Sequence, residues 1–209
     1  MPSPELVEFW DVVHEIQNAR CLNTSLSSTE QWEMFEVNDF FAPKKRILYI
    51  GSGAGESVID LASKNMKVSV LEVSQYAEAA IKGYFERFYL DAADLPNNTF
   101  DLVLSRLVAQ HMNDEDLAYQ VLHVTKAMKK EAVFAMQFYL LRDGQTALLP
   151  DLSNDDLDAQ RSGHVGRTKD VMQAIIEGNG GKILEWKKTI HHDNLPGQPI
   201  WQFVHIGKA

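Results

Sequence analysis

Apolar runs and amphipathic segments alternate along the chain from residue 46 to about residue 138. The apolar runs predict strands at 46–51, 67–72, 86–90, 100–105 and 131–138. Between them, apolar residues at helical spacing predict helices at 55–64, 75–83 and 115–129. Mostly continuous apolar runs are typical of strands buried on both faces, and their alternation with helices predicts an α/β fold with a parallel sheet.

The C-terminal part of the chain departs from this alternation. Thr168 is expected to cap a final helix that reaches about Glu177. Two strands follow it, at 182–191 and 199–207. Because the connection between them is short, we expect an antiparallel pair at the sheet edge. The sequence therefore predicts a seven-stranded sheet that is mostly parallel, with an antiparallel C-terminal strand.

A single domain is expected over residues 1–209, a usual size for one globular unit. Residues 1–43 have apolar positions at helical spacing and are expected to form an N-terminal helical cap. Residues 44–209 are expected to form the α/β core. Within that core, the largely polar stretch 139–167 is expected to be a lid or substrate segment.

A glycine-rich turn joins the first predicted strand to its helix. The apolar run 47–50 is followed at once by Gly51, Ser52, Gly53, Ala54 and Gly55, and the helical pattern begins after them. Glycines in such a turn let backbone N–H groups approach a ligand closely, and the helix N-terminus favours an anionic group. The alternative is a tight turn that needs glycine for its backbone alone.

Two acidic residues follow the next strands in turn. Glu72 ends the second strand, 17 residues after Gly55, and is placed to accept hydrogen bonds from ribose hydroxyls. Asp91 comes just past the third strand, where it could accept a bond from the exocyclic amine of a purine. Ligands bind outside the carboxyl ends of strands in such sheets, so both acids are expected beside the glycine turn. Each could also be an ordinary surface carboxylate.

Together these residues resemble class I S-adenosylmethionine-dependent methyltransferases, especially the small-molecule group often called type 11. The resemblance covers about residues 46–138 and implies a Rossmann-like, doubly wound fold. It also implies S-adenosyl-L-methionine as cofactor and a small-molecule acceptor for O- or N-methylation. The cofactor-binding residues that it implies are Gly51, Ser52, Gly53, Gly55, Glu72, Val73, Asp91, Ala92, Ser105 and Arg106.

The chain departs from this family at Tyr49. The family commonly has an acidic residue there, two positions before the first glycine, and that side chain helps to position the methionine end of the cofactor. Its replacement by tyrosine puts the contact to the amino group in doubt.

His111 is the first candidate for a catalytic base. It follows the fourth strand at the predicted site edge, and histidine titrates near neutral pH. It could instead hold the loop or cap a helix. Arg106 could orient an anionic substrate group or pair with a carboxylate, and Tyr139 and His164 could reach a substrate. Trp10, Trp32 and Phe35 are expected to be packing residues, although N-terminal helices often cover the pocket in the family that the chain resembles.

Composition and charge exclude several other classes. A net charge of −9, with Lys44–Arg46 as the one tight basic cluster, argues against nucleic acid as a partner. The single cysteine, Cys21, permits no disulfide within the chain. No apolar stretch is long enough for a bilayer, and the acidic N-terminus is unlike a secretory signal, so a cytoplasmic location is expected. His191, His192 and Asp193 are adjacent, but neighbours in a strand point to opposite faces, so no metal site is expected.

Two other functions are weighed against methyl transfer. One is a non-catalytic protein that binds S-adenosylmethionine or a partner on the same fold, which Tyr49 motivates. The other is an NAD(P)-dependent oxidoreductase, whose fingerprint Gly-x-Gly-x-x-Gly requires glycine where Glu56 stands. The methyl acceptor, the choice between O-, N- and C-methylation, and the oligomeric state are not encoded in any motif of this sequence.

Overall fold

The computed structural model describes residues 28–53, 55–141, 165–191 and 200–209, together with Pro4, Val7, Glu8, Trp10 and Asp11. Several residues named above lie outside this set: Cys21, Ala54, His192, Asp193 and all of 142–164, including His164. The expected division into a helical cap, a core and a lid segment therefore stays a prediction.

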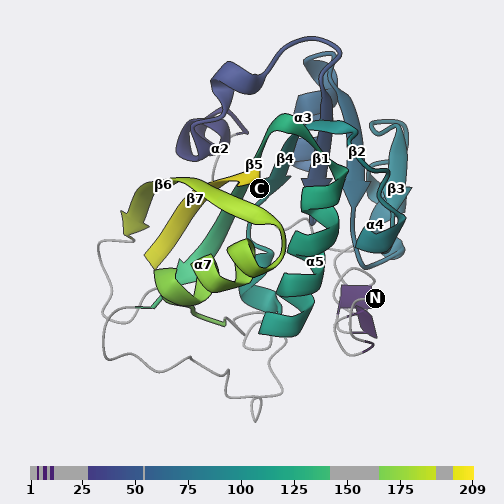
Figure 1. The fold of residues 1–209 in the computed structure, drawn as a ribbon. Helices are drawn as coiled ribbons and strands as arrows, with labels where there is room; N and C mark the ends of the chain where they lie inside the picture. Colours follow the sequence, from purple (N-terminus) through teal and green to yellow (C-terminus); the bar gives the residue numbers. More distant parts are fainter. Residues whose placement is uncertain are drawn as a thin grey trace.

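Within the described residues, one seven-stranded sheet runs in the order β3-β2-β1-β4-β5-β7-β6 (Figure 1). The first five strands are parallel; β7 is antiparallel to both of its neighbours, and β6 forms the edge. The predicted mostly parallel sheet with an antiparallel C-terminal strand is thus confirmed. The strands are β1 (Arg46–Ile50), β2 (Lys67–Leu71), β3 (Arg87–Tyr89), β4 (Phe100–Ser105), β5 (Met128–Leu140), β6 (Gly181–His191) and β7 (Ile200–Lys208).

Helices cover both faces of the sheet, as Figure 1 shows for α5 and α7 on the near face. The described helices are α2 (Ser28–Phe35), α3 (Glu56–Ser63), α4 (Tyr76–Ala80), α5 (Asp114–Ala127) and α7 (Lys169–Gly178), with short 3₁₀ helices η1 (Asn38–Phe40), η2 (Ala92–Asp94) and η3 (Ala109–His111). Side chains of β1 alternate between two cores. Leu48 and Ile50 belong to the first core, on the side of α5 and α7, and Ile47 and Tyr49 belong to the second core, on the side of α2 and α3. No described helix has the length and apolarity needed to cross a membrane.

The N-terminal packing residues behave as predicted. Trp32 and Phe35 of α2 are each 1% exposed and belong to the second core. The indole Nε1 of Trp32 donates to Oδ2 of Asp60 at 2.7 Å, which attaches α2 to α3. These contacts fix α2 beside the helix that follows the glycine turn.

Several predicted boundaries are wrong. The helix expected to reach residue 129 ends at Ala127, because β5 begins at Met128. Lys129, a polar residue that suggested helix, lies in this strand, and its Nζ donates to Asp101 at 2.9 Å. β5 also extends to Leu140, because its end pairs with Ile200 of β7. The helix expected over 75–83 is shorter, since α4 ends at Ala80 and Gly83 adopts a φ of +94° that a helix cannot include.

Candidate functional site

The carboxyl ends of β1, β2 and β4 meet at one edge of the sheet. In the strand register, Ile50 lies opposite both Leu71 and Ser105. The residues that follow these three positions are Gly51, Glu72 and Arg106. Residues far apart in the sequence are therefore brought together at the edge where the sequence predicted a ligand.

The three glycines of the turn have different surroundings. All have positive φ: +75° at Gly51, +51° at Gly53 and +90° at Gly55, the N-cap of α3. A Cβ on Gly51 would overlap Cγ2 of Val108, and one on Gly55 would overlap Cγ2 of Ile81. A Cβ on Gly53 would meet nothing within 4 Å. The outer glycines thus allow close packing, while the middle glycine faces open space that a ligand could fill.

Glu72 lies directly beside this turn. Its side chain is 5% exposed, and its Oε2 accepts from the Ser52 backbone N–H at 2.9 Å and from the Ser52 hydroxyl at 3.3 Å. The backbone N–H of Ser74 approaches Oε1 at 3.4 Å. A buried carboxylate with such donors is held in one orientation, and it holds the turn in return. Its expected role toward a ribose stays a prediction.

Asp91 is held by a residue that the sequence analysis missed. Its Oδ1 accepts from the Ala93 N–H at 2.9 Å, which caps η2, and from the hydroxyl of Tyr119 at 2.7 Å. Burial alone would raise the pKa of the Asp91 carboxyl, but these hydrogen bonds outweigh it and lower that pKa. Partial desolvation and the Asp91 contact raise the pKa of Tyr119 to about 12. Tyr119 therefore stays a hydrogen-bond donor and orients the carboxylate.

The remaining predicted cofactor residues lie around this edge. Ala92 is buried and Val73 is half-buried against the first core. Ser105 is fully buried at the end of β4, and its Oγ has no hydrogen-bond partner among the described residues. An orphaned buried hydroxyl costs free energy unless something else satisfies it, so Ser105 marks a place for a polar ligand group or a water molecule.

Tyr49 lies in the second core, 4% exposed, with its ring edge against Trp32 at 6.3 Å between centroids. Burial raises the pKa of its phenol, and the neighbouring Ser57 hydroxyl and Arg106 guanidinium only partly offset this. Burial lowers the pKa of Arg106, while Tyr49 and Glu56 raise it. The site therefore holds a neutral phenol and a guanidinium where the family has a carboxylate.

His111 is on η3, between β4 and α5, at the same end of the sheet. The amide nitrogen of Gln110 lies 3.2 Å from its Nε2, and the ring edge of Trp10 packs against the imidazole at 5.0 Å between centroids. Trp10 also packs against the first core, as expected of a packing residue. Gln110, which sequence reasoning missed, is 1% exposed, and its Oε1 has no partner within the described part of the chain.

Tyr139 lies near the carboxyl end of β5, and its expected reach to a substrate stays a prediction. It is 2% exposed in the second core, beside Trp201. Near it, sequence reasoning also missed Arg167, whose buried guanidinium binds the turn that carries His111. An isolated arginine 58 residues from its partner leaves no local signal in a sequence.

Removing the Tyr119 hydroxyl is expected to loosen Asp91. In Tyr119→Phe, the pKa of Asp91 should rise toward its ordinary value because a hydrogen bond to the ionised form is lost. The affinity for S-adenosylhomocysteine should fall about 3- to 10-fold, in line with one hydrogen bond of about 1 kcal/mol. NMR titration of the carboxyl groups and calorimetry measure the two effects.

The matched control is Tyr84→Phe, since Tyr84 is 46% exposed. The stability of the folded protein depends on the pKa of Asp91 as well. A carboxyl whose pKa is lowered by folding stabilises the folded state at neutral pH, and this contribution is lost as the pH falls through the folded pKa. The variant should therefore lose less stability than the wild type between pH 7 and acid pH. An unchanged Asp91 titration in Tyr119→Phe contradicts the assignment.

Comparison with known proteins agrees with the geometry of this edge. A family model described as a methyltransferase domain matches residues 48–136. No curated protein matches the sequence. The match begins in β1 and ends in β5, so it includes the glycine turn, Glu72, Asp91 and His111.

Three solved structures show the same fold at low sequence identity. The mitomycin 7-O-methyltransferase MmcR is 21% identical with a TM-score of 0.63, over 96% of this chain and 60% of that one. The 1,6-didemethyltoxoflavin-N1-methyltransferase of Burkholderia thailandensis is 11% identical with a TM-score of 0.72, over 100% of this chain and 92% of that one. The [4+2]-cyclase SpnF is 12% identical with a TM-score of 0.64, over 87% of this chain and 79% of that one.

The chain thus spans about 60% of the length of the mitomycin enzyme and nearly all of the toxoflavin enzyme. The chain therefore has a Rossmann-like fold like that of these methyltransferases, and its residues 48–136 match the methyltransferase-domain model.

Proposed function

We propose that this protein transfers a methyl group from S-adenosyl-L-methionine to an oxygen or nitrogen of a small-molecule acceptor. The observation that carries the proposal is the glycine turn with open space at Gly53, next to the oriented carboxylates of Glu72 and Asp91. Two of the structures with this fold are small-molecule O- and N-methyltransferases by name.

The residues at this edge fit that cofactor. Gly53 leaves room for the methionine end above the turn, Glu72 would accept from the ribose hydroxyls, and Asp91 would accept from the adenine amine. The orphaned Ser105 hydroxyl could satisfy a polar group of the bound ligand. Arg106, a guanidinium beside the neutral Tyr49, suits the methionine carboxylate, so this chain would hold that end through its anionic group.

The cofactor supplies an electrophilic methyl group on a sulfonium, so the protein's work is alignment and removal of a proton. His111 would accept the O–H or N–H proton of the acceptor at Nε2 once the acceptor has displaced the Gln110 amide, which donates to that nitrogen in the structure. Gln110 Oε1, buried and unpartnered among the described residues, could receive a hydrogen bond from the acceptor.

A second candidate function is a non-catalytic protein that binds S-adenosylmethionine or a partner on the same fold. It is favoured by the buried, neutral Tyr49 in place of a carboxylate. One of the similar structures is named a [4+2]-cyclase, so the names of proteins with this fold include chemistry other than methyl transfer. Dehydrogenase activity is disfavoured, because the Glu56 carboxylate opens α3 where a pyrophosphate would bind.

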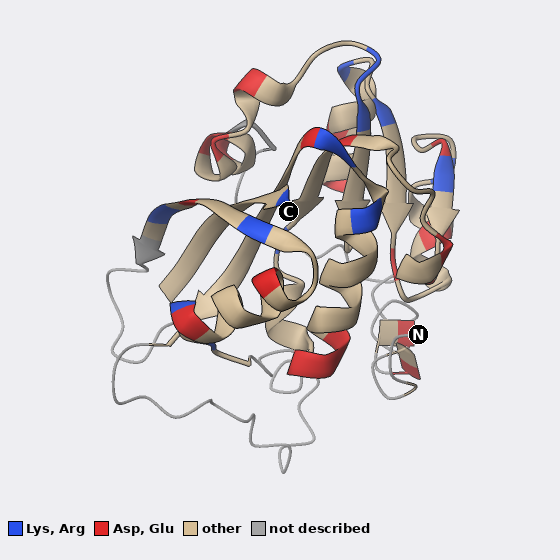
Figure 2. Cartoon of the chain, viewed as in Figure 1, with Lys and Arg blue, Asp and Glu red and all other residues tan. Residues whose placement is uncertain are grey.

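The same proposal includes the surroundings of the site. Residues 1–43 would cover the pocket, which the packing of Trp10 against His111 supports, and 139–167 would contribute to the acceptor site. The ribbon in Figure 2 is coloured for acidic residues at the first turn of α5, near the carboxyl ends of the strands, and for basic residues around the start of β1 at the opposite end. That basic group is paired with Asp101 and Glu86, which supports the proposal that nucleic acid is not a partner. The cytoplasmic location expected from the sequence is part of this proposal.

Calorimetry with S-adenosylhomocysteine, S-adenosylmethionine and NAD⁺ tests the cofactor. We expect both sulfur ligands to bind with micromolar dissociation constants and NAD⁺ not to bind. Absence of binding at millimolar concentration of either sulfur ligand contradicts the proposal. A screen of small phenols, carboxylic acids and amines for release of S-adenosylhomocysteine then separates enzyme from binding protein. Cofactor binding without turnover on any acceptor favours the second candidate.

A further inference from the structure

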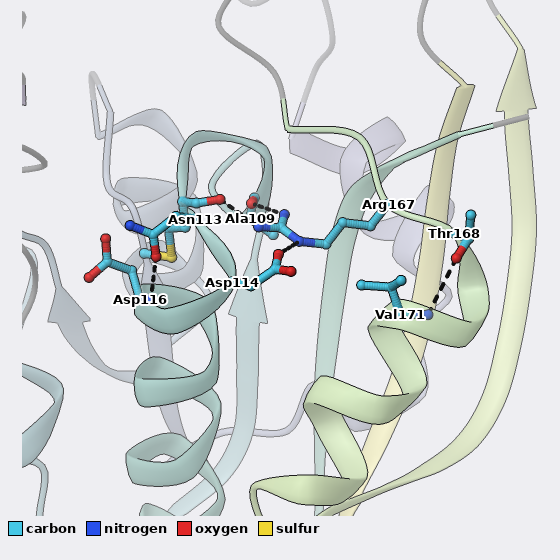
Figure 3. Close-up of polar contacts among 8 residues, drawn as sticks. Ala109, Asn113, Asp114, Asp116, Arg167, Thr168 and Val171 are labelled. Carbon is cyan, nitrogen blue, oxygen red and sulfur yellow. Dashed lines mark hydrogen bonds and ion pairs between the residues drawn. The ribbon is translucent and has the colours of Figure 1, made fainter. Parts of the chain in front are cut away.

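Arg167 stands immediately before Thr168, the N-cap of α7, and its side chain is only 2% exposed. Its guanidinium makes three contacts with the stretch between β4 and α5, drawn in Figure 3. Nε donates to Oδ1 of Asp114 at 2.7 Å, Nη1 to the carbonyl of Ala109 at 2.8 Å and Nη2 to the carbonyl of Met112 at 2.5 Å. One planar group thus binds both ends of the turn that carries His111.

The backbone around Arg167 reinforces this attachment. The N–H of Arg167 donates to the carbonyl of Tyr139 at 2.9 Å, and its own carbonyl accepts from the N–H of Leu141 at 3.1 Å. Two residues earlier, the N–H of Val165 donates to the carbonyl of Gln110 at 2.7 Å. Residues 165–167 therefore connect the end of β5 to the turn at three of its carbonyls: Ala109, Gln110 and Met112.

Burying the Arg167 guanidinium costs free energy that a role in packing alone does not explain. Burial lowers the pKa of the Arg167 guanidinium, and the contact with Asp114 raises it again. Asp114 itself is 61% exposed, and the other two hydrogen bonds of the guanidinium go to backbone carbonyls on either side of His111. Arginine alone supplies the rigid fork of donors that can fix two carbonyls at once. The guanidinium thus sets the path of the backbone between them.

We propose that Arg167 is a positioning residue for His111. By fixing Ala109 and Met112, it holds the Gln110 amide against Nε2 of His111, which places the ring proton on Nδ1 and the lone pair on Nε2, where the amide donates to it. This inference rests on the proposed function for the role of His111 as a base. The fork itself and its effect on the ring do not depend on methyl transfer.

The ¹⁵N spectrum of the His111 ring tests this proposal. In the wild type, the neutral ring should be mainly the Nδ1–H tautomer. In Arg167→Lys, which keeps the charge and loses the fork, the turn loosens and the signals should move toward the Nε2–H tautomer that predominates in free histidine. Asp114→Ala, which removes only the exposed partner, should cause a smaller shift in the same direction.

The matched control is Thr168→Ala. Thr168 caps α7 by accepting from the Val171 N–H at 3.3 Å, and its loss should lower the melting temperature without moving the His111 signals. If Arg167→Lys lowers the melting temperature and leaves the His111 tautomer unchanged, Arg167 is structural only and the proposal is overturned. If Arg167→Lys does not fold, Asp114→Ala decides, and an unchanged tautomer there also overturns it. Binding of S-adenosylhomocysteine, measured on the same samples, should stay within about twofold, since Arg167 makes no contact with the glycine turn. That measurement separates failure of this proposal from failure of the proposed function.

Discussion

Replacing Gly53 by alanine should abolish binding of S-adenosylhomocysteine and leave the protein folded. At a φ of +51° an alanine costs about 1–2 kcal/mol of unfolding free energy, and its Cβ meets no other atom of the protein. The same Cβ would occupy the open space above the turn that the proposed function gives to the ligand. We expect the dissociation constant to rise more than about 100-fold, a cost of roughly 3 kcal/mol.

Gly55→Ala is the matched control, because we expect it to lose more stability than Gly53→Ala and less affinity for the ligand. Its Cβ would overlap Cγ2 of Ile81, a fully buried side chain that cannot move aside into solvent. Overpacking adds about 1–3 kcal/mol to the cost of a positive φ, so we expect this variant to lose roughly 2–5 kcal/mol of stability. Chemical denaturation and calorimetry together resolve the two effects. Normal binding by Gly53→Ala would show that the turn is only structural.

The sequence could predict this contrast in part. The order of strand, glycines and helix is local, and the carboxyl ends of neighbouring parallel strands must meet at one edge, so Glu72 and Asp91 could be placed beside the turn. Which glycine faces open space could not be predicted. That depends on Val108 and Ile81, which reach the turn from other loops through the tertiary fold.

Other residues of the site could not be predicted from motif spacing either, because their contacts also form through the tertiary fold. Tyr119 holds Asp91 from 28 residues away, and Arg167 reaches Ala109 across 58 residues. Neither belongs to a motif, because a single hydrogen bond between distant elements leaves no pattern in either segment. The wrong start of β5 has a related cause: Lys129 resembles a helix-surface residue in the sequence, and it is the pairing with β4 and the contact to Asp101 that make it part of a strand.

Glu72→Gln should weaken cofactor binding and the turn together. The carboxylate accepts both groups of Ser52, and an amide of the same size must present an N–H to at least one of the donors around it. The loss of charge-assisted hydrogen bonds predicts a decrease of about 1–3 kcal/mol in unfolding free energy. If the same carboxylate also binds the ribose, the dissociation constant of S-adenosylhomocysteine should rise roughly 10- to 100-fold. Ser52→Ala is the control, since it removes only the 3.3 Å hydroxyl contact and keeps the carboxylate.

A comparison of two ligands then separates the ribose contact from the support of the turn. Adenosine and 2′,3′-dideoxyadenosine differ only in the two hydroxyls that Glu72 is proposed to bind. If Glu72 accepts from those hydroxyls, Glu72→Gln should weaken adenosine about 10-fold or more and leave dideoxyadenosine nearly unchanged, because the interaction is already absent from that ligand. If the carboxylate acts only by holding Ser52, both ligands should weaken equally. Ligand-observed NMR titrations can measure affinities this weak, and equal losses would reassign Glu72 from ribose binding to the support of the glycine turn.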